Sequence, residues 1–190
     1  IAQLNAGDTV RLMGPLGNPM PIPEIADNGA LILVGGGIGV APLYLYCRER
    51  RSENSSLPLK VLLGARRKSL LIGHQGFLDL GVDTGLATDD GSAGHHGNVI
   101  ELLEQEMEQL GPEAEIAGIG CGPHGMNVAL RDIAVEKNLK FWISLENYMP
   151  CGFGACFGCV IAGPEDGPLR YRRVCVEGPC FSVEELPAHF

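Results

Sequence analysis

The sequence has little positive charge and no long apolar run, and each shortage excludes a class of protein. It has 14 Lys and Arg against 23 Asp and Glu, and the resulting net charge of −9 gives general nucleic-acid binding no electrostatic basis. No apolar stretch reaches the roughly 18 residues of a membrane span, and no signal-peptide pattern is present. We therefore expect neither a nucleic-acid-binding protein nor one that spans a membrane.

The cysteine pattern also argues against a disulfide framework, because the seven cysteines are odd in number and mostly clustered. That pattern favours metal binding in a reducing cytoplasm. What the sequence does have is 190 residues with 45% hydrophobic and 19% charged content. This is enough for one sizeable globular domain and a small appendage.

A glycine-rich turn at residues 35–39 follows a short apolar run at 31–34 and precedes a helical stretch at 40–51. The apolar run predicts a buried parallel strand. A strand, a glycine turn and a helix N-terminus together form an anion site, because free N–H groups and the helix dipole both favour a phosphate. The alternative is a turn whose glycines serve only close packing of the strand on the helix.

The turn departs from the ordinary dinucleotide-binding fingerprint. The pattern G-x-G-x-x-G would need glycine where Val40 stands. An acidic residue is expected after the second strand, but Arg66 and Arg67 stand there. These arginines could pair with a 2′-phosphate or be ordinary exposed residues, so the choice between NAD and NADP stays open.

The strand–helix pattern repeats along the chain. Further strands are expected at 59–63, 83–88, 115–119 and 141–145, and further helices at 69–80, 99–110 and 124–136. Asn98 is expected to cap the helix that follows it. Short connections between alternating elements predict an α/β fold with a five-stranded parallel sheet and helices on both faces.

With the strand order 3-2-1-4-5, the turns at 35–39 and 120–123 meet at the carboxyl edge of the sheet, where such sheets bind ligands. Cys121 would face this crevice, and the alternative for it is an inert buried cysteine. The third strand ends in the polar residues 89–92. These residues suit a cofactor ribose or phosphate, or they form a solvated loop.

Cys151, Cys156 and Cys159 lie in one loop at Cys-x4-Cys-x2-Cys spacing, and Cys175 follows after a short polar hairpin. Four thiolates at this spacing, with glycines between them, are what a [2Fe–2S] cluster needs. The glycines permit positive φ angles and a close approach of backbone N–H groups. We predict these four cysteines as the cluster ligands, with Cys180 as the rival to Cys175.

Other chemistries for the four cysteines fit less well. Structural zinc usually takes two separate Cys-x2-Cys pairs, and only Cys156 and Cys159 form one. A redox-active pair would leave Cys151 and Cys175 without a role. Cys47 lies in a predicted helix, and we treat it as a non-ligand.

The organisation that these features predict has three parts. Residues 148–190 form a small hairpin module with strands at 160–162 and 169–176, which a bound cluster would stabilise. Residues 29–147 form the nucleotide-binding domain. Within 1–28, the stretch 9–13 is expected to be the last strand of a β-barrel whose remainder precedes this chain.

Four sequence motifs resemble the ferredoxin–NADP reductase superfamily in identity and order. They are residues 34–43, 87–92 and 121–123 and the cysteine loop. Within that superfamily, Cys175, residues 176–179 after it and residues 14–18 make the chain similar to the electron-transfer subunits of type B dihydroorotate dehydrogenase. The resemblance covers nearly the whole chain.

The resemblance implies an oxidoreductase subunit of pyrimidine biosynthesis, located in the cytoplasm. A nicotinamide nucleotide, NAD(H), would exchange a hydride with FAD, and electrons would pass through the [2Fe–2S] cluster to an FMN-containing catalytic subunit, in a heterotetramer. It places Cys121 by the nicotinamide ring as the catalytic residue. The nucleotide-binding residues that it implies are Gly36, Gly37, Gly39, Asp89, Asp90, Ser92, Gly122 and Pro123.

The sequence departs from the family in one respect. The family's flavin motifs, an Arg-x-x-Ser strand and a Gly-Thr pair, are absent from the 190 residues, so we expect weak FAD binding and a retained cluster. The same motifs also fit a flavin and iron–sulfur reductase subunit of a hydrogenase or a ferredoxin:NADP complex. A zinc-stabilised nucleotide-binding module is the alternative without redox chemistry.

Overall fold

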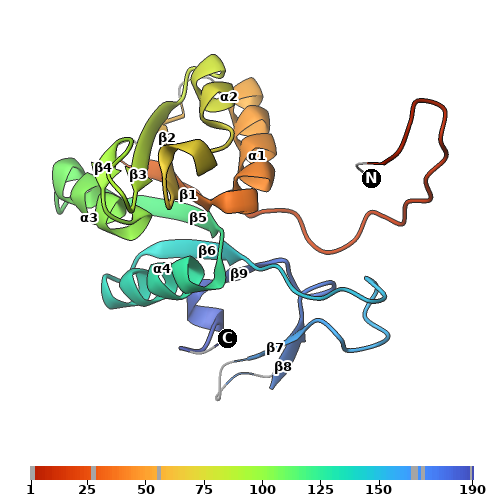
Figure 1. Ribbon diagram of the computed structural model, residues 1–190. Coiled ribbons are helices and arrows are strands. Elements are labelled where there is room, and N and C mark those ends of the chain that lie inside the picture. The colour runs from red at the N-terminus through yellow and green to blue at the C-terminus, as the bar shows by residue number, and fades with distance from the viewer. Residues whose placement is uncertain (1–2, 27–28, 55–56, 164–166, 168–169, 189) are drawn as a thin grey trace.

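A computed structural model describes the chain apart from residues 1–2, 27–28, 55–56, 164–166, 168–169 and 189. Its main feature is a sheet of seven strands in the order β4-β3-β2-β1-β5-β6-β9, with a separate two-stranded hairpin, β7-β8 (Figure 1). The strands are β1 Ala30–Gly36, β2 Leu59–Ala65, β3 Asp83–Thr88, β4 His95–His96, β5 Ile116–Cys121, β6 Lys140–Ser144, β7 Val160–Ala162, β8 Tyr171–Arg173 and β9 Cys180–Ser182.

Helices cover both faces of this sheet. They are α1 Val40–Glu53, α2 His74–Asp79, α3 Val99–Leu110 and α4 His124–Glu136, with short 3-10 turns at Gly37–Gly39, Lys68–Leu70 and Val183–Glu185. Leu31 and Leu33 of β1 pack toward α1 and α2, whereas Ile32 and Val34 pack toward α3 and α4. Because side chains alternate along a strand, a fully apolar β1 is buried on both faces.

The predicted core of the fold is confirmed. The five central strands are parallel and adjacent in the predicted order, with β1 paired to both β2 and β5. The helices predicted at 99–110 and 124–136 have those bounds. Asn98 caps α3 through a capping box with Glu101, as its sequence position indicates.

Two details differ from the prediction. The helix expected at 69–80 is interrupted at Gly73. The φ of +76° at this glycine separates the 3-10 turn Lys68–Leu70 from α2, which begins at His74. The sheet gains an edge strand on each side, β4 next to β3 and the antiparallel β9 next to β6. Through β9, the C-terminal module is anchored to the main sheet by the buried Phe181.

The strand predicted at 9–13 does not form: within the described residues 3–26 no strand is present. A strand needs a neighbour to satisfy its backbone groups, and Leu12 is 90% exposed. Hydrogen bonds at residues 18 and 21 hold the later part of this segment against the rest of the chain instead. The Tyr46 hydroxyl donates to the carbonyl of Pro21, and the backbone N–H of Asn18 donates to the carbonyl of Gly178, at 2.8 Å.

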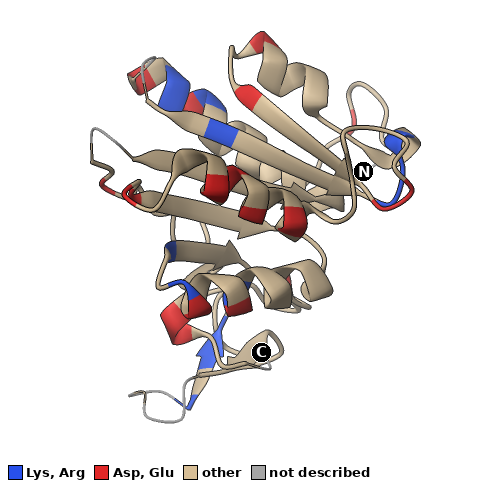
Figure 2. Cartoon of the chain, turned by 90° about the vertical axis from the view of Figure 1, so that its left-hand side faces the viewer, with Lys and Arg blue, Asp and Glu red and all other residues tan. Residues whose placement is uncertain are grey.

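Charge is unevenly distributed over these elements. Figure 2 shows acidic residues along α3 and basic residues on β8. The acidic net charge of −9 therefore coexists with a local basic strip on β8, the strand that leads to Cys175.

Within the described residues, no helix is long and apolar enough to cross a membrane.

Candidate functional site

The turns after β1 and β5 lie in direct contact at the carboxyl edge of the sheet. Gly35 is paired with Cys121 across the two strands. A Cβ atom on Gly39 would lie 2.2 Å from the carbonyl oxygen of Cys121, and one on Gly36 would lie 2.9 Å from Cδ of Pro123. Glycine is needed at these two positions because any side chain would push the turns apart.

This contact places two helix N-termini at one crevice. Neither α1, which follows the 3-10 turn Gly37–Gly39, nor α4, which starts after Pro123, has a side-chain cap. The first N–H groups of each helix therefore remain available to an anion. Gly37 has a φ of +54° and open space beside it, so the backbone can be approached closely there.

A cavity of about 190 Å³ opens at this edge between the two turns and the ends of β2 and β3. Its lining includes Gly36, Arg66, Asp89, Asn98, Pro123 and Met126. Asp90 and Ser92 instead bond to each other, since the Asp90 carboxylate accepts from both the backbone and the hydroxyl of Ser92. These bonds lower the pKa of Asp90. Of the acidic pair, Asp89 is therefore the member that reaches the cavity.

Cys121 ends β5, half-buried, beside the crevice. Burial raises the pKa of its thiol, partly offset by a hydrogen bond with Ser144 on the neighbouring strand. Cys180 stands on the other side of Ser144 in β9, and burial raises its pKa to about 11. Cys121, Ser144 and Cys180 thus form a row across three strands, and Cys180 belongs to this row.

The other four candidate thiols gather as two pairs. The sulfur atoms of Cys159 and Cys175 are 3.3 Å apart, near the ~3.7 Å that separates two sulfurs bound at ~2.3 Å to one tetrahedral metal ion. The thiols of Cys151 and Cys156 share a hydrogen bond. All seven cysteines are free thiols.

Backbone N–H groups surround these sulfurs. The amides of Cys156, Phe153 and Ala155 donate to the sulfur of Cys151, and together with the Cys156 thiol they lower its pKa to about 6. The amide of Gly154 donates to Cys175, although burial raises the pKa of that thiol overall. The amide of Gly158 donates to Cys156 at 3.3 Å.

Such an arrangement suits an iron–sulfur centre. Amides aimed at sulfur stabilise thiolates and tune the potential of a cluster. Gly152 and Gly154 have φ values of +78° and +86°, which lets the loop turn its N–H groups inward. Within the described residues, no group of three or more Cys, His, Asp or Glu side chains is arranged around a single ion. The four thiols stand instead as two pairs, and a centre with two metal ions would take one pair at each ion.

Phe153 and Phe157 lie on the outside of the loop, and each is 60% exposed. They face solvent, and the guanidinium of Arg173 lies over the ring of Phe157 at 5.4 Å.

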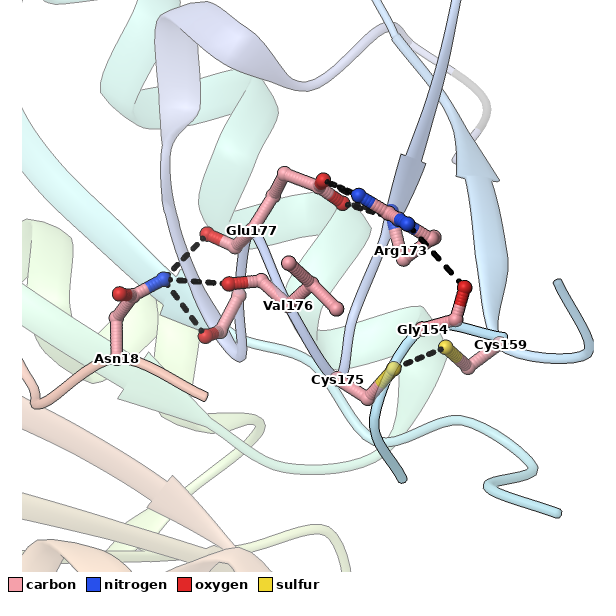
Figure 3. Close-up of polar contacts among 8 residues, drawn as sticks. Asn18, Gly154, Cys159, Arg173, Cys175, Val176 and Glu177 are labelled. Carbon is pink, nitrogen blue, oxygen red and sulfur yellow. Dashed lines mark hydrogen bonds and ion pairs between the residues drawn. The ribbon is translucent and has the colours of Figure 1, made fainter. Parts of the chain in front are cut away.

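Sequence reasoning missed a set of polar contacts behind the cysteine loop. Arg173 pairs with Glu177 and also donates to the carbonyl of Gly154 (Figure 3). Asn18 donates to the carbonyls of Val176, Glu177 and Gly178. An Arg and a Glu four residues apart are a visible signal, but nothing in the sequence shows that Gly154 or Asn18 lies beside them.

The sheet, the crevice and the four thiols together define a class: reductases of the ferredoxin reductase fold that carry an iron–sulfur centre. The chain is 32% identical to an NADH-dependent reduced ferredoxin-NADP oxidoreductase of known structure, with a TM-score of 0.73 over 95% of this chain and 61% of that one. An Amycolatopsis cytochrome P450 reductase, 22% identical with a TM-score of 0.56, shares the fold.

Within that class the relatives are more specific. Residues 146–187 match the family model of the iron-sulfur cluster binding domain of dihydroorotate dehydrogenase B. The chain is 37% identical to the electron transfer subunits of dihydroorotate dehydrogenase B (NAD(+)) of Caldanaerobacter subterraneus and Enterococcus faecalis, over 98% and 97% of its length and 69% and 68% of theirs. The chain belongs to this family of electron transfer subunits.

Family membership bears out three predictions made from the sequence. The protein is an oxidoreductase subunit, its task is electron transfer, and its cofactor classes are an iron–sulfur cluster, FAD and NAD. The individual site residues stay predictions, since they rest on the sequence and on the geometry given above.

Proposed function

We propose that the chain passes electrons between NAD(H) and a catalytic subunit that interconverts dihydroorotate and orotate in pyrimidine biosynthesis. The observation that carries this proposal is the pairing of Cys151 with Cys156 and of Cys159 with Cys175, next to backbone N–H groups that donate to the sulfurs. The names of the relatives support it. The finer assignments of an FMN-containing partner, a heterotetramer and a cytoplasmic location follow the same reasoning, and a reducing compartment suits free thiols.

The proposal gives each part of the chain a task. Residues 29–147 bind the nucleotide and 148–190 hold the cluster, with 1–28 leading into them. Gly36, Gly37 and Gly39 let the pyrophosphate approach the two helix N-termini. Asp89 faces the ribose, while Asp90 and Ser92 shape the loop behind it.

Gly122 and Pro123 form the second wall of the crevice, and Cys121 stands beside the nicotinamide ring as the catalytic residue. Burial keeps the Cys121 thiol protonated at neutral pH. A neutral thiol packs against an apolar ring without an opposing charge. The Ser144 hydroxyl fixes the direction in which the thiol points.

The cluster, when bound, accepts and donates single electrons. Cys151, Cys156, Cys159 and Cys175 would hold it, and the amides of residues 153–156 and 158 would stabilise its thiolates. FAD supplies the exchange between two-electron and one-electron transfer. The family's main flavin motifs are absent from these 190 residues, so no residue of this chain is assigned to FAD.

Iron and acid-labile sulfide analysis of anaerobically purified chain tests the proposal. We expect equal amounts of iron and sulfide, two of each per chain, with visible absorption that bleaches on reduction. Zinc without iron would refute the electron-transfer function and favour a zinc-stabilised nucleotide-binding module.

A second candidate partner is a ferredoxin:NADP complex, because the structural relative at 32% identity is a ferredoxin-NADP oxidoreductase. Reconstitution separates the two. NADH-dependent reduction of orotate, with FAD added and a dihydroorotate dehydrogenase catalytic subunit present, supports the first. Transfer to ferredoxin with no orotate reduction supports the second.

The face of the cysteine loop is the proposed docking surface for the catalytic subunit. Phe153 is an exposed aromatic beside the predicted cluster, and such residues anchor interfaces. We expect Phe153→Asp to weaken the complex roughly 10- to 30-fold, from the ~1.5–2 kcal/mol that an aromatic anchor carries. Isothermal titration with the catalytic subunit measures it.

The matched control for this change is Leu78→Asp. Leu78 is 45% exposed on α2, at the end of the molecule opposite the β7-β8 hairpin (Figure 1). It should leave the affinity unchanged. Wild-type affinity in the Phe153 variant, with a normal cluster content, would move the docking surface elsewhere.

A further inference from the structure

Arg173 is the side chain that joins the two halves of the predicted cluster site. It ends β8, two residues before Cys175, and it is half-buried. Its Nη1 atom donates to the carbonyl oxygen of Gly154 at 3.2 Å. Its Nε atom lies 3.2 and 3.3 Å from the two carboxylate oxygens of Glu177. The same guanidinium also covers the Phe157 ring, so it contacts both the cysteine loop and the turn that carries Cys175.

The carbonyl that Arg173 binds belongs to a peptide whose other end faces a sulfur. The peptide between Gly154 and Ala155 points its oxygen at the guanidinium and its N–H at the sulfur of Cys151. Because the two ends of a peptide are opposed, fixing the oxygen fixes the direction of the N–H. Arg173 thus orients the donor to Cys151 through this peptide. The N–H of Gly154, in the preceding peptide of the same loop, donates to Cys175.

Glu177 closes the turn on the other side. Its Oε2 atom accepts from the backbone N–H of Arg173 at 2.6 Å, and the N–H groups of Val176 and Glu177 donate to the carbonyl of Arg173. Cys175 therefore lies inside a turn tied at both ends. Asn18 supports the same turn from outside through its bonds to the carbonyls of residues 176–178 (Figure 3).

We propose that Arg173 is a positioning residue of the iron–sulfur centre, which orients the Gly154–Ala155 peptide toward the thiolates and, together with Glu177, sets the reduction potential. This inference rests on the proposed assignment of Cys151, Cys156, Cys159 and Cys175 as ligands. It assigns a role to a charged pair outside the nucleotide site proposed above.

The charges of the pair act on the potential in opposite directions. Taking up an electron adds negative charge to the centre, so a nearby cation favours the reduced form and a nearby anion disfavours it. The guanidinium ends β8 two residues before Cys175 and bonds to the Gly154 carbonyl between Cys151 and Cys156, which places its charge near the predicted ligands. Partial burial limits screening by salt.

The test is a redox titration of the full chain with its cluster loaded. Electron paramagnetic resonance measures the fraction of reduced cluster at each potential. We expect Arg173→Gln to lower the midpoint potential, because Glu177 is left unpaired beside the centre. Glu177→Gln should raise the potential, because the guanidinium is left unneutralised. A purely structural pair would not shift the potential in opposite directions.

Two further variants separate charge from geometry. Arg173→Lys keeps the charge but cannot bind Gly154 and Glu177 together, so we expect a potential near wild type and several-fold faster loss of iron to a chelator. Arg172→Gln is the matched control. Arg172 is the adjacent residue, and it pairs with Glu185 at 2.7 Å, away from the cysteine loop. It should leave the potential unchanged.

Shifts of the same sign in the Arg173→Gln and Glu177→Gln variants, or an equal shift in Arg172→Gln, would overturn the inference. If Arg173→Gln fails to assemble a cluster, Glu177→Gln decides, since only a rise supports the inference. The wild-type chain distinguishes a failure of this inference from a failure of the proposed function. A wild-type chain without iron refutes the proposed function, whereas a loaded wild type with unmoved variants refutes only the role of Arg173.

Discussion

Replacing Cys175 with alanine is expected to abolish the iron–sulfur cluster, whereas replacing Cys180 with alanine is expected to leave it intact. The sulfur of Cys175 lies 3.3 Å from that of Cys159, and it receives the amide of Gly154. Cys180 is paired across the sheet with Ser144 instead. Iron content and visible circular dichroism of the two purified variants measure the outcome.

The effect should extend beyond the cluster itself. The β7-β8 hairpin is small, and a bound metal centre contributes its binding free energy to the stability of such a module. We expect Cys175→Ala to lower the melting temperature of the loaded chain to that of the cluster-free wild type. Cys180→Ala removes a half-buried thiol of the same size and so controls for the lost side chain. Cluster loss in the Cys180 variant alone would exchange the roles of the two cysteines.

The sequence was sufficient for the centre of the fold because that part follows local rules. The buried run in β1 has no polar residue to mark a solvent face, and the helices α3 and α4 show their apolar spacing and their start signals directly. The contact of the two turns follows from strand order alone, since adjacent parallel strands end at the same edge.

The parts that could not be predicted depend on distant neighbours. β9 is three residues long, too short for a period to show, and it exists because β6 offers an open edge. The stretch 9–13 has the composition of a strand but no partner among the described residues, so composition alone was misleading.

The candidate site divides in the same way. The four cysteines could be selected as candidates from spacing, because Cys151, Cys156 and Cys159 lie in one short loop of the sequence, and their role as ligands stays a prediction. The Arg173–Gly154 contact joins residues 19 apart in sequence, and Asn18 lies about 160 residues from its partners. No local pattern encodes such pairings. These contacts include the ones proposed to set the reduction potential. The kind of metal centre was therefore easier to predict from the sequence than the residues that would set its potential.

Replacing Gly39 with alanine is expected to cost about 3 kcal/mol of folding free energy, the upper part of the usual range for overpacking. The backbone of Gly39 has a φ of −61°, which alanine adopts freely, so the cost is purely steric. The new methyl group would lie 2.2 Å from the Cys121 carbonyl oxygen and 2.8 Å from the Gly122 nitrogen. These are backbone atoms at the end of β5 and in the turn after it, and they cannot move without shifting β5.

Thermal unfolding measures this change, and a loss of roughly 6–12 °C in melting temperature is expected for a domain of this size. The matched control is Gly125→Ala in α4, where a Cβ atom meets nothing within 4 Å. Alanine there should stabilise the helix by about 0.5–1 kcal/mol. Two glycine-to-alanine changes, one at a crowded turn and one at an open helix position, should therefore have opposite signs.

The same change should weaken NADH binding, because a shifted β5 turn separates the helix N-termini that face the pyrophosphate. Equilibrium binding of NADH to the Gly39 variant, measured below its melting temperature, tests this link between packing and function. If the Gly39 variant is destabilised yet binds NADH as tightly as the wild type, the crevice between the two turns is not where the nucleotide binds. A stability equal to the wild type would show that the turns are not in contact.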